Sequence, residues 1–284
     1  MTIAVTGATG QLGRLVIESL KSRVPAGEIL ALVRDPAKAA DLGVAVRAAD
    51  YAKPETLATA LEGVDTLLLI SSDAVGQRVA QHRNVIEAAK AAGVKRIAYT
   101  SILRADTTPI ALAEEHKATE ALIEASGIPY ALLRNGWYFE NYTGSLAGAV
   151  AAGSTIGASG EGQISAAARA DYAQAAAVVV TTPHSGNQVY ELAGDTAFTR
   201  AELAAEASRQ TGKAIAHADL PEAEYARILE GFGLPAPHAA IIAQSDVGAA
   251  QGGLFDDSRT LSGLIGRPTT SLADAVASAL NTAG

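Results

Sequence analysis

Three glycines near the N-terminus have the spacing of a phosphate-binding turn. Gly7, Gly10 and Gly13 form a G-x-x-G-x-x-G pattern that follows an apolar strand pattern and precedes a helical one. In such a turn the first glycine permits the tight bend, the second lets the main chain approach a pyrophosphate, and the third lets the helix pack close to the sheet. N–H groups at the helix start then face the phosphates. The pattern predicts a dinucleotide site; the alternative is an ordinary glycine-rich turn.

Arg34 stands at the end of the second predicted strand, 21 positions after Gly13. NAD sites usually place an acid here, which bonds the ribose 2′-hydroxyl. A guanidinium instead binds a 2′-phosphate through two hydrogen bonds, whereas a carboxylate would repel it. We therefore expect NADP(H) to be preferred over NAD(H). Two alternatives stay open: Asp35 could serve the ribose of NAD, and Arg34 could be a solvated surface charge.

Alternating strand and helix patterns in the first half of the chain must position these residues. Such alternation is typical of an α/β protein with a doubly wound parallel sheet, the Rossmann fold. Strands are expected at residues 2–6, 29–33, 44–48, 66–70, 96–100 and 130–134, and helices at 11–22, 54–61, 78–92 and 113–125.

The pattern changes after Arg134. Residues 135–164 indicate loops around one short helix, 171–181 a helix with Asp171 at its N-cap, 189–192 and 214–218 strands, 222–230 and 272–280 helices, and 248–253 a glycine-rich loop. Thr199 and Glu202 have the spacing of a capping box that opens a helix to about Thr211. We expect residues 1–134 to form an NADP-binding Rossmann domain, to which 165–193 return. Residues 135–284 should form a smaller, interleaved α/β lobe for the substrate.

Composition excludes several other classes of protein. With 284 residues, 49% of them hydrophobic and 18% charged, the chain is expected to be globular. It has no cysteine, which rules out disulfides and thiolate chemistry. A formal charge of -8 argues against nucleic acid as a partner. We find no apolar run long enough to cross a membrane and no leader before the first strand, so a soluble cytoplasmic protein is expected.

The histidines do not suggest a metal site. The five are His82, His116, His184, His217 and His238, and no two of them are spaced i, i+4. We therefore expect no bound metal.

Several stretches together resemble one family. They are residues 7–13, 30–36, 81–101 (QHRNVIEAAKAAGVKRIAYTS), 130–142 (YALLRNGWYFENY), 190–194 (YELAG) and 256–270 (DDSRTLSGLIGRPTT). This pattern is similar to the NmrA-like branch of atypical short-chain dehydrogenases over almost the whole chain. Within that branch the sequence most resembles the bacterial type 2 NADPH:quinone oxidoreductases. The resemblance implies NADP(H) as the cofactor and a quinone as the substrate.

The resemblance also implies the site residues. For the cofactor they are Gly7, Thr9, Gly10, Gln11, Leu12 and Gly13 at the pyrophosphate, Arg34 at the 2′-phosphate, Asp50 near the adenine, Ser71 and Ser72 toward the nicotinamide ribose, and Asn135, Gly136 and Trp137 at the nicotinamide. Trp137, Tyr138 and Phe139 would form a flat apolar slot for a quinone ring. Alternatively, the two serines form only a turn, and the aromatic residues only fill a seam between lobes.

The usual catalytic acid is missing. Ordinary short-chain dehydrogenases use Tyr-x-x-x-Lys; here Lys117 occupies the lysine position, but Ala113 occupies the tyrosine position. Glu120, three residues after Lys117, also fits the pattern of this helix, and His116 next to Lys117 could donate a proton, although a lone histidine is more often structural. Lys117 and Tyr138 are the candidate catalytic residues, with an exposed helix charge as the alternative for Lys117.

A quinone tolerates the loss of that acid, because its carbonyls are already electron-poor. General acid catalysis contributes about 10²–10⁴-fold where it operates, so only a reactive acceptor can do without it. The sequence shows no flavin signature, so we expect a two-electron reduction of quinones by direct hydride transfer from NADPH. The alternative is a non-enzymatic NADP(H) sensor that binds a protein partner. A homodimer is compatible with the sequence.

Overall fold

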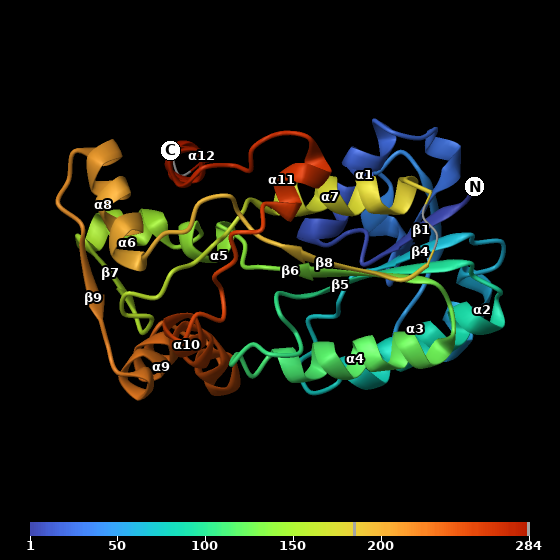
Figure 1. Ribbon diagram of the computed structural model, residues 1–284, viewed down its shortest axis with the longest axis horizontal. Coiled ribbons are helices and arrows are strands. Elements are labelled where there is room, and N and C mark those ends of the chain that lie inside the picture. The colour runs from blue at the N-terminus through green and yellow to red at the C-terminus, as the bar shows by residue number, and fades with distance from the viewer. Residues whose placement is uncertain (184–185, 283–284) are drawn as a thin grey trace. The chain divides into compact units, whose positions relative to one another are not determined.

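The chain forms two compact units, each built from separate stretches of sequence (Figure 1). The computed structural model describes residues 1–183 and 186–282. Unit 1 consists of Met1–Ala105, Glu114–Asn135 and Arg169–Tyr190. Unit 2 consists of Asp106–Ala113, Gly136–Ala168 and the chain from Glu191 onward. Each unit is therefore completed only by segments that lie far apart in the sequence.

A seven-stranded sheet is the centre of unit 1. Its strands are β1 (Ile3–Thr6), β2 (Ile29–Val33), β3 (Ala45–Ala48), β4 (Thr66–Leu69), β5 (Arg96–Ile102), β6 (Tyr130–Asn135) and β8 (Gln188–Leu192), in the order β3-β2-β1-β4-β5-β6-β8. Neighbouring strands from β3 to β6 pair in parallel. The order reverses between β1 and β4, which is the point where doubly wound sheets bind ligands. The predicted Rossmann sheet is confirmed.

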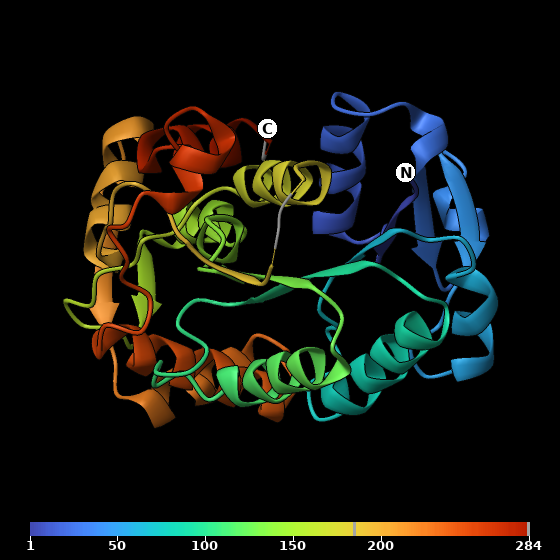
Figure 2. The ribbon, with the colours of Figure 1, turned by 45° about the vertical axis from the view of Figure 1, so that its right-hand side comes forward.

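Helices cover both faces of this sheet, with α1 and α7 on one side and α3 and α4 on the other (Figures 1 and 2). The helices are α1 (Gln11–Lys21), α2 (Pro54–Ala60), α3 (Arg78–Ala91), α4 (Ala113–Ser126) and α7 (Arg169–Thr181). Helix α1 packs on α7, and α2 packs on α3. Strands β1, β2 and β4 are buried along their whole length, as expected for a sheet that is covered on both faces.

Unit 2 is mostly helical, with one small sheet. It contains α5 (Glu140–Thr143), α6 (Leu146–Ala152), β7 (Ser154–Gly157), α8 (Arg200–Thr211), β9 (Ala216–Asp219), α9 (Glu222–Gly231), α10 (Ala236–Ala250), α11 (Thr260–Ile265) and α12 (Leu272–Thr282). Strands β7 and β9 pair in parallel, and α9 packs against α10. The capping box is confirmed, because the Thr199 hydroxyl accepts from the Glu202 N–H while the Glu202 carboxylate accepts from the Thr199 N–H.

The predicted elements up to residue 134 are confirmed, and each end lies within two residues of its predicted position. Three expectations beyond that point are wrong. Residues 135–164 contain two helices and strand β7 rather than one short helix. Asp171 is not an N-cap, because α7 begins at Arg169 and places this buried carboxylate in the first turn. An acidic side chain there still complements the helix dipole.

The third correction concerns residues 248–253, of which the first three belong to α10. This helix was missed because Pro235 occupies its N-cap and supplies no side-chain cap. A Cβ at Gly248 would lie 2.6 Å from the Cγ1 atom of Ile110. The glycine is therefore needed for packing rather than for a flexible loop.

Candidate functional site

The glycine turn joins β1 to α1 at the reversal of strand order. Gly7 has φ +58°, the left-handed conformation that favours glycine. The N–H of Gly10 donates to the Gly7 carbonyl at 2.9 Å, which closes the turn. Gly10 then stands at the N-cap of α1 with an extended backbone, and it brings no side chain to the first N–H groups of the helix. Those groups are therefore available to an external anion.

Gly13 sets the distance between α1 and the turn. A Cβ at this position would lie 2.3 Å from the Gly7 carbonyl oxygen and 2.7 Å from the Ala8 Cα. The third glycine thus allows α1 to pack directly on the backbone of the turn that precedes it. The sequence had predicted only a close approach of the helix to the sheet.

Arg34 follows the last residue of β2 and is exposed. Among the described residues it forms no ion pair, which leaves the guanidinium available. The carboxylate of Asp35 is already used, since it accepts from the Ala37 N–H at 3.0 Å and caps a short 3₁₀ helix (Pro36–Ala39). Arg14 fixes the same segment by bonding Asp41 at 2.7 Å and the Lys38 carbonyl at 2.8 Å. The Arg34 side chain is therefore exposed to solvent, whereas the Asp35 carboxylate is engaged in capping the 3₁₀ helix.

Asp50 and Tyr51 follow β3, and the Tyr51 hydroxyl lies near Gly7 of the glycine turn. One oxygen of the half-buried Asp50 carboxylate accepts from the Ala52 N–H at 3.0 Å. Sequence reasoning missed Tyr51, whose hydroxyl donates to the Ile70 carbonyl at 2.9 Å. A Cβ at Gly7 would come within 3.9 Å of that hydroxyl. Burial raises the pKa of Tyr51, so its hydroxyl keeps its proton and fixes the end of β4 beside the turn.

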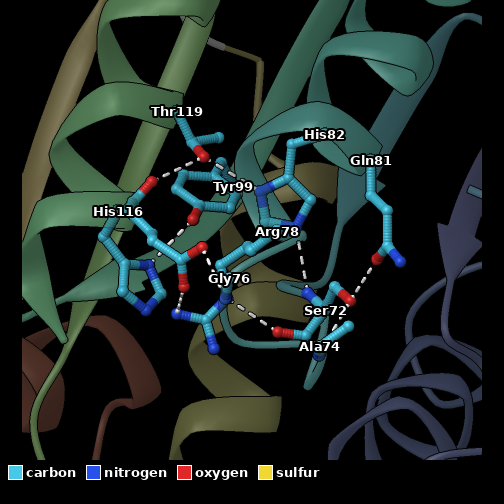
Figure 3. Close-up of polar contacts among 10 residues, drawn as sticks. Ser72, Ala74, Gly76, Arg78, Gln81, His82, Tyr99, His116 and Thr119 are labelled. Atoms are coloured by element: carbon cyan, nitrogen blue, oxygen red, sulfur yellow. Dashed lines mark hydrogen bonds and ion pairs between the residues drawn. The ribbon is translucent and has the colours of Figure 1, made fainter.

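Ser71 and Ser72 begin the segment that leaves β4. The Ser71 N–H donates to the Thr100 hydroxyl at 2.9 Å, and the Ser72 N–H donates to Nε2 of His82 at 2.9 Å. Figure 3 shows Ser72 beside three side chains of α3, those of Arg78, Gln81 and His82. The segment is therefore held by side chains from neighbouring elements rather than by strand pairing.

Helix α4 carries Ala113 and Lys117, the residues at the two positions of the Tyr-x-x-x-Lys pair. Lys117 is exposed on this helix, and Ala113 is buried. Glu120 is buried in an ion pair with Arg134, with contacts of 3.0 and 2.7 Å, and also accepts from the Ser101 hydroxyl at 2.5 Å. Glu120 is therefore engaged in joining α4 to β5 and β6.

His116 is buried and bonded to the Tyr99 hydroxyl at 2.8 Å. Burial lowers the pKa of His116 well below its ordinary value, so the ring is neutral at neutral pH. An imidazolium proton is therefore not available there at neutral pH.

The predicted nicotinamide and quinone residues lie at the end of β6 and just after it. Asn135 ends β6, and its buried Oδ1 atom has no hydrogen-bond partner among residues 1–183 and 186–282. Within unit 2, the Gly136 N–H donates to the Leu192 carbonyl at 2.7 Å. Tyr138 forms a parallel bridge with Ala167. The backbone of this aromatic run is thus fixed.

The three aromatic side chains differ in burial. Trp137 and Tyr138 are half-buried, whereas Phe139 is 2% exposed and stacks on Phe198 with ring centroids 5.4 Å apart. The Phe139 ring belongs to the core of unit 2. Trp137 and Tyr138 keep surface that a planar ligand could contact.

The described parts of the chain hold no cluster of three or more His, Asp or Glu side chains that could bind a metal ion. His184 lies outside the described residues. No helix within residues 1–183 and 186–282 is long and apolar enough to span a bilayer.

A family model described as the NmrA-like family matches residues 1–274. The chain belongs to the NmrA-like family. Among its NmrA-like relatives, Quinone oxidoreductase 2 of Escherichia coli (strain K12) is 57% identical over 282 residues, which is 98% of this chain and 99% of that protein.

Two solved structures are closely similar to this NmrA-like chain. The NADPH-dependent quinone oxidoreductase of Escherichia coli complexed with NADPH has a TM-score of 0.96 and 57% identity, covering 99% of this chain and 100% of that chain. The Citrobacter sp. triphenylmethane reductase complexed with NADP(H) has a TM-score of 0.94 and 39% identity, covering 98% and 100%.

Three features of this NmrA-like chain fit a phosphorylated dinucleotide. The glycine turn leaves free N–H groups where a pyrophosphate would bind. Arg34 is exposed and without an ion-pair partner among the described residues. The Asn135 Oδ1 atom is buried without a partner in the same part of the chain, and a carboxamide N–H would satisfy it.

Sequence reasoning missed the polar residues beneath the β4–α3 connection. Arg78 and His82 occupy the buried face of α3 together with Val85, Ile86 and Ala89. Their i, i+4 spacing on an otherwise apolar face was the available signal, because buried polar side chains need specific partners.

Proposed function

We propose that this protein reduces quinones with NADPH by direct two-electron hydride transfer. The observation that carries the proposal is the 57% identity over 98% of the chain to a quinone oxidoreductase, together with a solved relative that holds NADPH. The glycine turn and the exposed Arg34 on this chain are the matching features of the cofactor site. We infer that no flavin is needed, because a hydride donor and an electron-poor acceptor suffice.

Bound NADPH supplies the hydride, and the chain binds and orients the reactants. The α1 N-terminus holds the pyrophosphate, Arg34 the 2′-phosphate, and Asn135 the carboxamide of the nicotinamide. Asp50, Ser71 and Ser72 complete the proposed cofactor site. A hydride and one proton would together convert the quinone to a hydroquinone, and the proton would come from water or a weak donor because Ala113 replaces the usual acid.

Trp137 and Tyr138 are the residues that we propose for quinone binding, since both keep exposed surface. We propose that Phe139, which is stacked on Phe198, supports the same site from the core of unit 2. Lys117 and Tyr138 are the proposed catalytic side chains, and the exposure of Lys117 is compatible with a contact to the nicotinamide ribose. A cytoplasmic location and a homodimer stay predictions.

The test is oxidation of NADPH followed by absorbance with simple benzoquinones and naphthoquinones. We expect oxidation that depends on the acceptor, with one NADPH consumed per hydroquinone formed and no flavin absorbance in the purified protein. Tyr138→Phe and Lys117→Met test the catalytic assignments, and a kcat within twofold of wild type would remove the residue concerned from the mechanism. Tight cofactor binding without any oxidation would instead favour the sensor.

Arg34→Ala is expected to weaken NADPH binding by about tenfold to a hundredfold while leaving NADH binding unchanged. A hydrogen bond to a charged group is worth roughly 1.5–3 kcal/mol, which corresponds to that range. Titration of cofactor fluorescence gives both dissociation constants.

Arg83→Ala is the matched control, because Arg83 is an exposed arginine on α3. It should leave the ratio of the two constants unchanged. If Arg34→Ala also left the ratio of the NADPH and NADH dissociation constants unchanged, Arg34 would not bind the 2′-phosphate.

A further inference from the structure

Residues 71–77, which lie in the connection between β4 and α3, are held in shape by hydrogen bonds from side chains. Every polar group of Ser72 is bonded: its N–H donates to His82 Nε2 at 2.9 Å, its carbonyl accepts from Arg78 Nε at 2.7 Å, and its hydroxyl bonds Gln81 (Figure 3). These three partners lie within the first five residues of α3. Helix α3 therefore bonds Ser72 at three groups: its N–H, its carbonyl and its hydroxyl.

His82 is held in one tautomer. Its Nε2 accepts the Ser72 amide proton, so the ring proton lies on Nδ1, which is 3.0 Å from the Thr119 hydroxyl oxygen. The Thr119 hydroxyl in turn donates to the Glu115 carbonyl at 2.8 Å. Each link therefore has one donor and one acceptor. The ring is 0% exposed, and burial lowers the pKa of His82 to about 3, so it stays neutral and able to accept.

A side chain of α4 bonds the C-terminal part of residues 71–77. The Glu115 carboxylate accepts from the Gly76 N–H at 3.0 Å, and its other oxygen lies 3.5 Å from Arg78 Nη1. Tyr99 separates the two histidines, with its ring 5.4 Å from that of His82 and its hydroxyl bonded to His116. The network thus connects both ends of residues 71–77 to two helices and to β5 (Figure 3).

We propose that His82 is a positioning residue for the cofactor, acting through Ser72 to keep residues 71–77 in the conformation that binds the nicotinamide ribose. This inference rests on the proposed function, which places Ser71 and Ser72 at that ribose. A buried imidazole is costly to desolvate, and an apolar side chain would fill the space equally well. What the imidazole adds is an acceptor for the Ser72 N–H, without which that group would lose its partner. If residues 71–77 are already ordered, binding of the cofactor does not have to offset the entropy lost in ordering them, so its affinity is higher.

Two variants of His82 separate this role from packing. His82→Gln keeps an acceptor near the Nε2 position, whereas His82→Asn keeps a donor near the Nδ1 position and loses the contact with Ser72. We expect the dissociation constant for NADPH to rise about tenfold in His82→Asn and to stay within threefold of wild type in His82→Gln. The KM for NADPH should follow it, with kcat at saturating NADPH unchanged.

Thr119→Val is the second variant, in case His82→Asn does not fold. It removes the acceptor that holds the His82 proton on Nδ1, so weaker NADPH binding is again expected. Equal dissociation constants for His82→Asn, His82→Gln and wild type, with only the melting temperature lowered, would assign His82 to structure alone. So would unchanged NADPH binding in Thr119→Val if that is the variant that folds.

The readout also separates this inference from the proposed function. Cofactor fluorescence needs no quinone, so the His82 variants can be ranked even if the wild-type protein oxidises no NADPH. In that case the quinone activity fails and the positioning role stands. Normal quinone turnover with equal NADPH binding in all three proteins would overturn the positioning role alone.

Discussion

Gly13→Ala is expected to weaken NADPH binding by about a hundredfold. The new Cβ would lie 2.3 Å from the Gly7 carbonyl oxygen, and both groups belong to the backbone of one tight turn. Helix α1 must therefore move away from the turn, at an overpacking cost of about 1–3 kcal/mol. The same shift displaces the N–H groups of the first helical turn, and each bond to a phosphate that is lost costs a further 1.5–3 kcal/mol or so. Fluorescence titration with NADPH measures the effect.

Gly27→Ala is the control for Gly13→Ala. Gly27 lies in a 3₁₀ turn before β2, and a Cβ there meets nothing within 4 Å. Its NADPH affinity should equal that of wild type. If Gly13→Ala bound NADPH within threefold of wild type, the close approach of α1 to its own turn would not matter for the cofactor.

The free energy of unfolding is expected to fall by about 2 kcal/mol between pH 7 and pH 5 from the buried His82, and the buried His116 adds to the loss in the same direction. Burial lowers the pKa of His82 to about 3 and the pKa of His116 well below the ordinary value of 6.5. In the unfolded chain both rings take up protons below pH 6.5, whereas in the folded protein they do not. Stability is therefore complete above pH 6.5 and is lost as the pH falls, by about 2 kcal/mol for His82 over this range.

Urea unfolding at several pH values measures this loss. Burial raises the pKa of Asp246, which acts in the opposite direction over its own titration range, so the comparison is made between variants. His82→Gln should lose about 2 kcal/mol less than wild type between pH 7 and pH 5. His238→Gln, which changes an exposed side chain of α10, should match wild type. A pH dependence in His82→Gln as steep as that of wild type would contradict the assignment to His82.

Local signals explain why the nucleotide-binding half could be predicted from the sequence. The turn from Gly7 to Gly13 and the strand patterns depend on neighbouring residues and on periods of two or 3.6. The fate of Asp35 could not be decided in this way. Its carboxylate accepts from the N–H of Ala37, two residues further along the chain. That bond depends on the conformation of the chain after β2, which the sequence pattern does not specify.

The network around His82 could not be predicted because its partners outside α3 come from three separate parts of the chain. Ser72, Tyr99 and Thr119 lie 10, 17 and 37 residues from His82 in the chain, counted from the numbering. Nothing in their local sequence brings them together. Helix α10 was missed for a different reason: its N-cap is Pro235, which offers no side-chain cap, and it contains a glycine that packing requires.

The division of the chain between the units has a consequence for synthesis on the ribosome. Helix α7, which packs on α1, and strand β8, which pairs beside β6, come from residues 169–192. A nascent chain that ends near Asn135 has the glycine turn and five neighbouring parallel pairs, but it leaves one face of α1 and one edge of the sheet uncovered. Unit 1 is therefore completed only after residues 169–190 have emerged, and until then the nascent chain lacks the helix and the strand that cover these surfaces in the complete protein.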